Sequence, residues 1–169
     1  MYGSSIERVL EESRRHLDRV EPDRLTHETA AGAVVVDIRP AASRAAEGPL
    51  PGAVVLERTV LEWRLDPTSP DRIPEADDPD CRIIVVCDEG YSSSLAAEML
   101  QRLGLRGATD LVGGYRAWRL LTRAVAAPPA PSSRNGAACP DAHSVVEPLS
   151  AAAPALEDVD TWDSTRAPS

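Results

Sequence analysis

The chain contains the segment Arg82-Ile83-Ile84-Val85-Val86-Cys87-Asp88-Glu89-Gly90-Tyr91-Ser92-Ser93-Ser94, which carries its strongest structural signal. The uninterrupted apolar run at 83–86 is typical of a strand buried on both faces of a parallel sheet. Cys87 ends this strand, a loop with Gly90 follows, and a helical pattern begins at Ser92. Backbone N–H groups at such a strand-to-helix turn favour an anion, so a thiol there loses its proton easily. The segment therefore predicts a nucleophilic Cys87 held by its own loop.

Similar strand and helix signals continue on both sides of this segment. Apolar strand patterns occupy 33–38, 53–56 and 108–112, and helical patterns occupy 41–46, 60–65, 92–103 and 115–124. Alternation of this kind predicts an α/β domain with a central, mostly parallel sheet of about five strands and helices on both faces. Ligand sites in such sheets lie at the carboxyl ends of the strands, where Cys87 is expected.

The two ends of the chain differ from this central part. Residues 1–20 predict an N-terminal helix that packs on the domain, with a capping box of Ser4 and Glu7. The domain itself is expected over 21–124. Residues 125–169 are rich in proline and alanine and are acidic, and they have no periodic pattern, which is typical of a disordered tail.

The composition excludes several classes of function. The chain has 169 residues and a formal charge of −9, so it is poorly suited to gripping nucleic acid. No apolar run approaches the roughly 20 residues needed to cross a bilayer, and no secretory signal is visible. No cluster of cysteine and histidine predicts a metal site. We expect a cytoplasmic protein that needs no metal or cofactor; the sequence does not indicate its oligomeric state.

Four short motifs resemble those of rhodanese-like domains and follow in the same order. They are Asp37-Ile38-Arg39-Pro40, Leu50-Pro51-Gly52-Ala53, the loop from Cys87 to Ser93, and Gly113-Gly114-Tyr115-Arg116-Ala117-Trp118. The resemblance implies a single-domain sulfurtransferase. In this class, a persulfide forms on the catalytic cysteine, here Cys87, with sulfur from a small donor. The sulfur then passes to a thiol, a protein thiol or another thiophilic acceptor.

The resemblance also assigns roles to the residues around the thiol. The loop residues would bind substrate: Asp88, Glu89, Gly90, Tyr91, Ser92 and Ser93. Many family members have an arginine at the place of Ser92, whereas this loop has two carboxylates and no cation. Carboxylates oppose thiolate formation and repel a dianion, so we expect weak activity with thiosulfate. Arg39 would compensate if it folds over the loop, with Asp37 as its structural support.

The same residues allow two other interpretations. A binding module or a sulfur- or redox-sensing module with little turnover would keep the fold and the thiol. A cysteine phosphatase would need a phosphate-gripping arginine six residues after the cysteine, and Ser93 stands there. The loop therefore gives phosphate binding little support.

Overall fold

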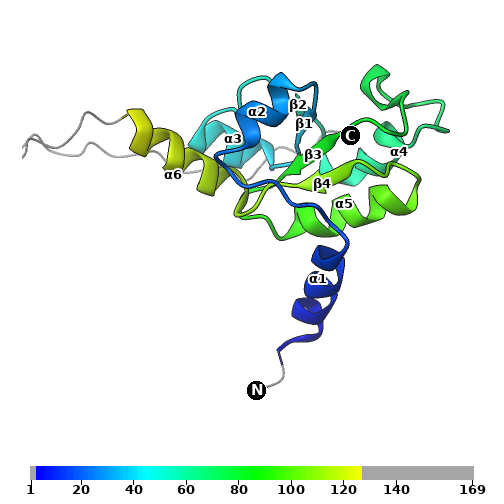
Figure 1. Cartoon of the computed structure of the whole chain (residues 1–169), viewed down its shortest axis with the longest axis horizontal. Coiled ribbons are helices and arrows are strands. Elements are labelled where there is room, and N and C mark those ends of the chain that lie inside the picture. Colours follow the sequence, from blue (N-terminus) through cyan, green and yellow to red (C-terminus); the bar gives the residue numbers. More distant parts are fainter. Residues whose placement is uncertain (1–2, 127–169) are drawn as a thin grey trace, which may run out of the picture. The chain divides into compact units, whose positions relative to one another are not determined.

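The computed structural model describes residues 3–126 and contains a four-stranded, wholly parallel sheet (Figure 1). The predicted tail lies outside the described residues from position 127 onward. The strands stand in the order β2-β1-β3-β4. Their bounds are β1 Val34–Asp37, β2 Val54–Val55, β3 Ile83–Val86 and β4 Ala108–Asp110. Asp37 pairs with Val86 and Asp110 with Val85, so the carboxyl ends of three strands meet beside Cys87.

Helices cover both faces of the sheet, as the sequence predicts (Figure 1). Their bounds are α1 Ser5–Arg15, α2 Leu25–Ala30, α3 Ala41–Glu47, α4 Leu61–Leu65, α5 Ser92–Arg102 and α6 Gly114–Ala126. Two short 3₁₀ helices, η1 Arg58–Val60 and η2 Pro74–Ala76, lie in the connections. The predicted α/β class is confirmed.

The sheet has four strands in the part of the chain that is described, close to the expected count of about five. Val20 begins a fifth strand beside β4: its N–H donates to Asp110 and its carbonyl accepts from Val112. The pairing stays an isolated bridge between Val20 and Leu111. Two residues further on stands Pro22, which has no N–H for the next ladder bond.

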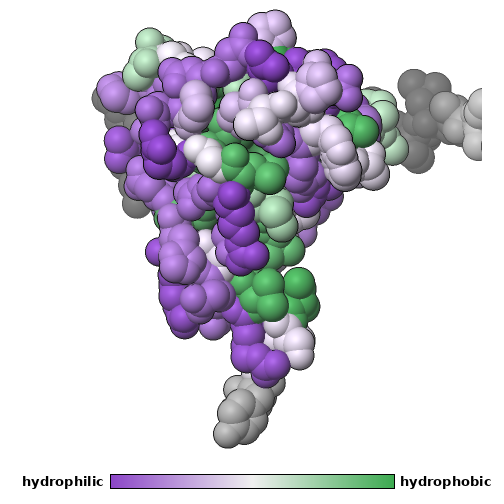
Figure 2. Space-filling view, turned by 90° about the vertical axis from the view of Figure 1, so that its right-hand side faces the viewer, coloured by the Kyte–Doolittle hydropathy of each residue, from purple (hydrophilic) through white to green (hydrophobic). Residues whose placement is uncertain are grey.

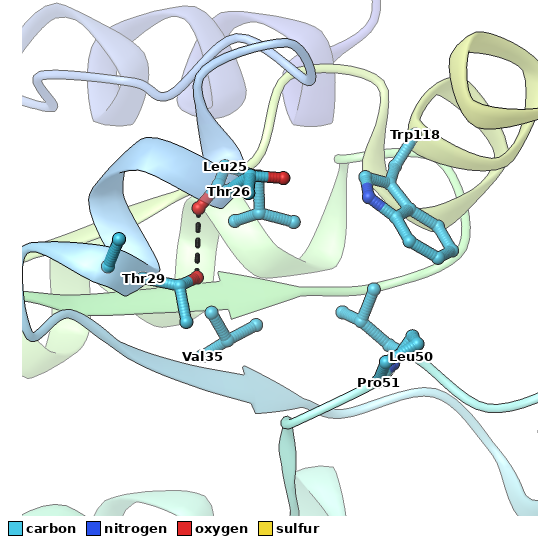
Figure 3. A pocket seen from close by; sticks show the side chains of 8 residues that line it. Leu25, Thr26, Thr29, Val35, Leu50, Pro51 and Trp118 are labelled. Carbon is cyan, nitrogen blue, oxygen red and sulfur yellow. Dashed lines mark hydrogen bonds between the residues drawn. The ribbon is translucent and has the colours of Figure 1, made fainter. Parts of the chain in front are cut away.

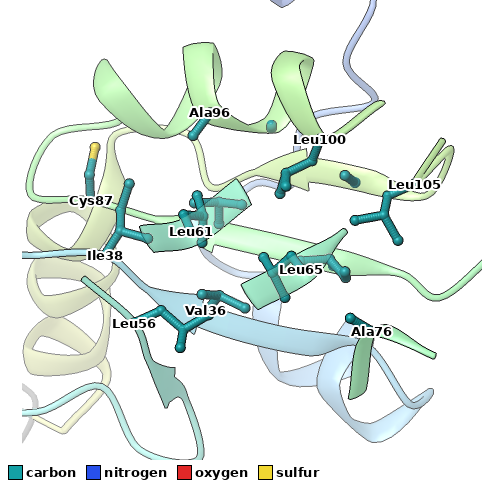
Figure 4. Close-up of a cluster of buried hydrophobic side chains, with 14 of the residues drawn as sticks. Val36, Ile38, Leu56, Leu61, Leu65, Ala76, Cys87, Ala96, Leu100 and Leu105 are labelled. Atoms are coloured by element: carbon teal, nitrogen blue, oxygen red, sulfur yellow. The ribbon is translucent and has the colours of Figure 1, made fainter. Parts of the chain in front are cut away.

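The strand β3 divides the core into two halves. Ile83 and Val85 face a cluster with α4 and α5, whereas Ile84 and Val86 face a cluster with α2 and α6. Both sets are buried because alternate residues of a strand point to opposite faces of a sheet covered on both sides. Figure 4 shows the first cluster, with Cys87 at its end next to Ile38. The thiol thus lies where the apolar core gives way to the active loop.

The helix α1 begins as the sequence predicts but ends earlier. Ser4 accepts from the Glu7 N–H and the Glu7 carboxylate accepts from the Ser4 N–H, which confirms the capping box. The helix ends at Arg15 rather than near position 20. The chain leaves it so that Leu17 enters the core and Val20 extends beside β4.

Candidate active site

Cys87 is the first residue after β3, and its sulfur is enclosed by the following loop. The thiol is 6% exposed. The Gly90 N–H donates to Sγ at 3.1 Å, and the Ser93 hydroxyl oxygen lies 3.1 Å from the same atom. The loop therefore places one backbone and one side-chain hydrogen-bonding group on the sulfur, as the sequence predicts for an anion.

These contacts change the acidity of the thiol. Burial alone raises the pKa of Cys87, because it penalises the charged form. The hydroxyls of Ser92 and Ser93 and the backbone N–H groups of Ser93 and Glu89 outweigh burial, so the net pKa lies below the ordinary value. The thiolate, which is the nucleophilic form, is thus favoured despite the buried setting.

The loop is held from behind by the start of α6. The N–H of Tyr115 donates to the Cys87 carbonyl at 2.9 Å, and the N–H of Arg116 donates to the Asp88 carbonyl at 3.1 Å. This contact requires a glycine at position 114: its φ is +61°, and a Cβ there would clash with the Cys87 carbonyl and lie 2.8 Å from that of Asp88. The Gly113-Gly114 motif is thus a packing device under the loop.

A buried carboxylate that the sequence analysis did not single out lies beside the loop. Asp110 ends β4 and is fully buried. It accepts from Ser93 at 3.2 Å and from Ser94 at 2.7 Å, and the Arg19 guanidinium contacts both of its oxygens. An acidic residue at the end of a short apolar strand pattern was the available signal, since strand ends gather at one edge of the sheet.

Ser93 has one hydroxyl hydrogen and two neighbours that compete for it. With a protonated thiol, the hydroxyl can donate to Asp110 and accept from Cys87. With a thiolate, the hydroxyl must turn to donate to sulfur. Asp110 then keeps its bonds from Ser94 and Arg19. The Ser93 hydroxyl can therefore turn toward the sulfur when the thiol loses its proton, and the buried Asp110 carboxylate keeps hydrogen-bond partners in both states.

The acidic side chains of the loop are partly neutralised. Glu89 forms an ion pair with Arg116, which belongs to the Gly-Gly motif at the start of α6. The sequence analysis did not assign this role to Arg116. Burial lowers the pKa of Arg39, but Asp37 raises it above the ordinary value, and the charge of the nearby Asp88 adds to this effect. The loop itself has no cation, but neighbouring elements supply two.

Arg39 does not fold over the loop, so its expected role in contacting substrate is wrong. Its side chain is 0% exposed. It donates to Asp37 Oδ2 at 2.8 Å and to the Gly48 carbonyl at 2.9 Å, and it stacks on the Tyr115 ring at 3.5 Å from the centroid. Asp37 accepts these bonds and orients the guanidinium, as expected of a supporting residue. A buried guanidinium needs partners for its charge and its N–H groups. Here Asp37, the Gly48 carbonyl and the Tyr115 ring provide them, and none of these three belongs to the active loop.

A groove lies between α1 and the junction of the loop with α5. The groove has a volume of about 510 Å³ and is lined by Ser4, Ile6, Glu7, Leu10, Tyr91, Ser92 and Leu95. The Tyr91 side chain is 58% exposed there. Ile6 and Val9, which the helical pattern places on the inner face of α1, remain exposed. Figure 2 shows hydrophobic side chains along one side of α1 and hydrophilic ones along the other.

A second hollow lies on the other face of the sheet, between α2, β1 and α6 (Figure 3). Leu25, Val35, Leu50 and Trp118 give it an apolar lining, and Thr29 donates to the Leu25 carbonyl at 2.8 Å. Its lining contains no titratable side chain. This hollow offers no group for acid–base or nucleophilic chemistry.

Within residues 3–126, no group of three or more His, Cys, Asp or Glu side chains could hold a metal ion. Among the helices of the same residues, none is long and apolar enough to cross a membrane. The candidate site is therefore built from one thiol, its loop and the charges around it.

A parallel α/β sheet that presents an activated thiol in a strand-to-helix loop defines a class of cysteine-dependent domains. The model of the Rhodanese-like domain family matches residues 21–121. The chain belongs to the rhodanese-like family.

Similar proteins agree with this assignment. The thiosulfate sulfurtransferase GlpE of Stutzerimonas stutzeri is 37% identical over 101 residues, which are 60% of this chain and 84% of that protein. The same enzyme of Pseudomonas entomophila is 36% identical with the same coverage. A solved Rhodopseudomonas palustris protein of unknown function, called a possible tyrosine phosphatase, has a TM-score of 0.64 and 29% identity. That match covers 72% of this chain and 94% of the other.

Proposed function

We propose that the protein is a sulfurtransferase that carries sulfane sulfur as a persulfide on Cys87 and delivers it to a thiol or another thiophilic acceptor. One observation carries the proposal. The thiol has a lowered pKa, and the Gly90 N–H and the Ser93 hydroxyl surround its sulfur at 3.1 Å. The same groups suit the terminal sulfur of a persulfide, which is also an anion.

The chemistry balances without an added oxidant or reductant. The Cys87 thiolate attacks the outer sulfur of a donor, the sulfur–sulfur bond of the donor breaks, and the leaving group departs with the electron pair. The product is a persulfide anion on Cys87. An acceptor thiolate then attacks the terminal sulfur and takes it, and the Cys87 thiolate leaves with its own electron pair. Each cycle returns the enzyme to its starting state.

The loop residues have different roles in the proposed sulfur transfer. Gly90, Ser92 and Ser93 stabilise the negative sulfur, and Tyr91 borders the groove through which substrates approach. Asp88 and Glu89 set the charge of the entrance. Asp37 and Arg39 support the loop from behind without touching substrate.

The charges favour a donor other than thiosulfate. Arg116 offsets Glu89, but Arg39 lies buried behind Asp88 and offers no contact to an incoming dianion. Ile6, Leu10 and Leu95 give the adjoining groove an apolar lining that suits the organic part of a persulfide. The similar GlpE proteins are named for thiosulfate. We infer the same reaction type here with an organic persulfide as the better donor.

Steady-state assays with a thiol acceptor test this proposal. Transfer from an organic persulfide should have a kcat/KM at least about tenfold above that from thiosulfate, a difference of about 1.4 kcal/mol. Cys87→Ser should abolish both reactions. Persulfide on Cys87 without turnover to any acceptor would instead favour the alternative of a sulfur-sensing module.

A phosphatase finds no support in this geometry. Ser93 stands where a phosphate-gripping arginine is needed, and Asp110 lies directly behind it. A buried carboxylate at that place repels phosphate. We expect no hydrolysis of an aryl phosphate.

A further inference from the structure

We propose that the segment before residue 21 is a working part of the active site and that Arg14 is a positioning residue for the active loop. Arg14 and Arg19 both precede residues 21–121, which match the family. Arg14 contacts Gly90, which donates to the Cys87 sulfur, and Arg19 contacts Asp110, which accepts from the other partner of the sulfur, Ser93. The proposal deepens the proposed function, on which it rests only for the sulfur-transfer step.

Arg14 contacts the residue whose N–H faces the sulfur. Its Nη2 donates to the Gly90 carbonyl at 2.7 Å, and its Nε donates to the Ser94 hydroxyl oxygen at 3.2 Å. The Gly90 φ of +78° lies in the left-handed region, which glycine adopts readily, so the direction of its carbonyl is set by its contacts. The Gly90 carbonyl belongs to the peptide that follows the Gly90 N–H, so Arg14 restrains the loop one Cα away from the N–H that points at Sγ.

The single hydrogen of Ser94 makes this contact more important. The Ser94 hydroxyl lies within reach of both the Gly90 carbonyl, at 3.0 Å, and Asp110, at 2.7 Å. It can donate to only one of them, and the shorter bond to a buried carboxylate is the stronger. The Gly90 carbonyl then depends on Arg14.

Arg19 holds the other side of the same network. It binds Asp110 through Nε at 2.7 Å and Nη2 at 3.1 Å, and Asp110 in turn accepts from Ser93. One arginine therefore supports the Gly90 contact to sulfur, and the other supports the Ser93 contact. The loop has no cation of its own, and these residues bring two positive charges to its supports.

The charge balance around the loop determines what Arg14 does to the thiol. The ring stack of Arg14 on Tyr91, at 5.6 Å, keeps its charge at the mouth of the loop. Other titratable or charged groups near the loop come from the neighbouring elements. They are Asp88, Glu89 and Tyr91 of the loop, Glu7 of α1 in the adjoining groove, Arg19 between α1 and α2, Asp37 at the end of β1, Arg39 after it, Asp110 of β4, and Tyr115 and Arg116 of α6. Arg14 is the α1 cation that contacts the loop through Gly90 and Tyr91, and its loss should favour the neutral thiol.

The pH dependence of Cys87 alkylation tests this in the full chain. The Cys87 peptide is followed by mass spectrometry, so that Cys81 and Cys139 do not contribute. Arg14→Gln should raise the alkylation midpoint and slow the reaction at pH 7 about three- to tenfold, since one pKa unit changes the thiolate fraction tenfold below the midpoint. Arg14→Lys, which keeps the charge, should recover at least half of the rate.

Arg15→Gln is the matched control. Arg15 is the next residue of α1, is exposed, and pairs with Glu12 rather than with the loop. It should leave the midpoint unchanged. An unchanged midpoint in Arg14→Gln would overturn the inference; if that variant fails to fold, a midpoint in Arg14→Lys shifted by a full unit would do so. Because alkylation needs no sulfur donor, these outcomes are independent of whether the protein transfers sulfur.

Discussion

The hydroxyl oxygen of Ser93 lies 3.1 Å from the sulfur of Cys87 and connects it to a buried carboxylate, Asp110, 3.2 Å further on. The two serines that follow one another in α5 both reach this carboxylate, but Ser94 has no bond to the sulfur among the contacts found. Comparing variants of Ser93 and Ser94 can therefore separate the effect of a hydroxyl on the sulfur from its effect on the stability of the fold.

Ser93→Ala should raise the pKa of Cys87, because the thiolate loses a hydrogen-bond donor. We expect alkylation at pH 7 to slow about three- to tenfold. Ser94→Ala is the comparison: each variant removes one bond to Asp110 and should cost about 1 kcal/mol of unfolding free energy. Ser94→Ala also removes an acceptor of Arg14, so its alkylation midpoint should rise, but less than that of Ser93→Ala. Equal midpoints of alkylation in the two variants would show that Ser93 acts only through packing.

Cys81 and Cys87 should titrate on opposite sides of the ordinary thiol value. Burial and the charges of Asp78 and Glu75 raise the pKa of Cys81, whereas the loop donors lower that of Cys87. Alkylation of the native protein should give a midpoint below the ordinary thiol value for Cys87 and above it for Cys81. In denaturant the two midpoints should converge; native midpoints in the reverse order would contradict the geometry of the loop.

The lowered pKa of Cys87 makes the free energy of unfolding depend on pH. The folded-state pKa of Cys87 lies below its unfolded value, so the folded state binds the thiol proton less tightly. The contribution to stability is full above the unfolded pKa and is lost as pH falls through the folded pKa. Denaturant midpoints of the native chain should therefore rise between these two pH values more than those of Cys87→Ser. Parallel curves would count against the shift.

Gly114→Ala should strongly destabilise the protein because its Cβ would meet the backbone of Cys87 and Asp88. Gly52→Ala is the control, because it introduces the same kind of backbone strain without a clash. Gly52 has a φ of +73°, and nothing lies within 4 Å of the added Cβ. The control should lose about 1–2 kcal/mol from the left-handed conformation alone. We expect Gly114→Ala to lose clearly more in urea unfolding, and equal losses would mean that the loop does not press on α6.

Neutralising Glu89 should improve the use of an anionic donor. Glu89→Gln frees Arg116 from its ion pair and removes one negative charge from the entrance. The KM for thiosulfate should fall several-fold at low salt and less at high salt, because exposed charges are screened. Arg106→Gln serves as the control, since Arg106 pairs with Asp80 at the opposite edge of the sheet. A KM that does not respond would place the donor away from Glu89.

The sequence predicts the fold and the loop well because their signals are local. The apolar run before Cys87, the glycine in the loop and the helical pattern after it act within a dozen residues. The Gly113-Gly114 pair is also visible as a motif. What it does is not visible, because its contact with the Cys87 carbonyl joins distant parts of the chain.

The charges around the site escape prediction for the same reason. Arg14 is 76 residues from Gly90 and Arg19 is 91 residues from Asp110. Nothing in a helical pattern tells which flanking arginine turns toward a loop. For Arg39 the sequence motif correctly predicts a position near the site but not the direction of the side chain. The side chain is buried because it donates to Asp37 and to the Gly48 carbonyl. Whether an arginine side chain contacts the active loop therefore depends on packing between distant parts of the chain.

Intact mass spectrometry after brief exposure to an organic persulfide tests the central claim most directly. The account predicts that the full chain gains the mass of one sulfur atom, that peptide mapping places it on Cys87, and that a thiol acceptor removes it. Cys87→Ser should gain nothing, whereas Cys81→Ser should gain as much as the native chain. A native chain that gains no sulfur from the persulfide, polysulfide or thiosulfate, or that carries it equally after Cys87→Ser, would contradict the account.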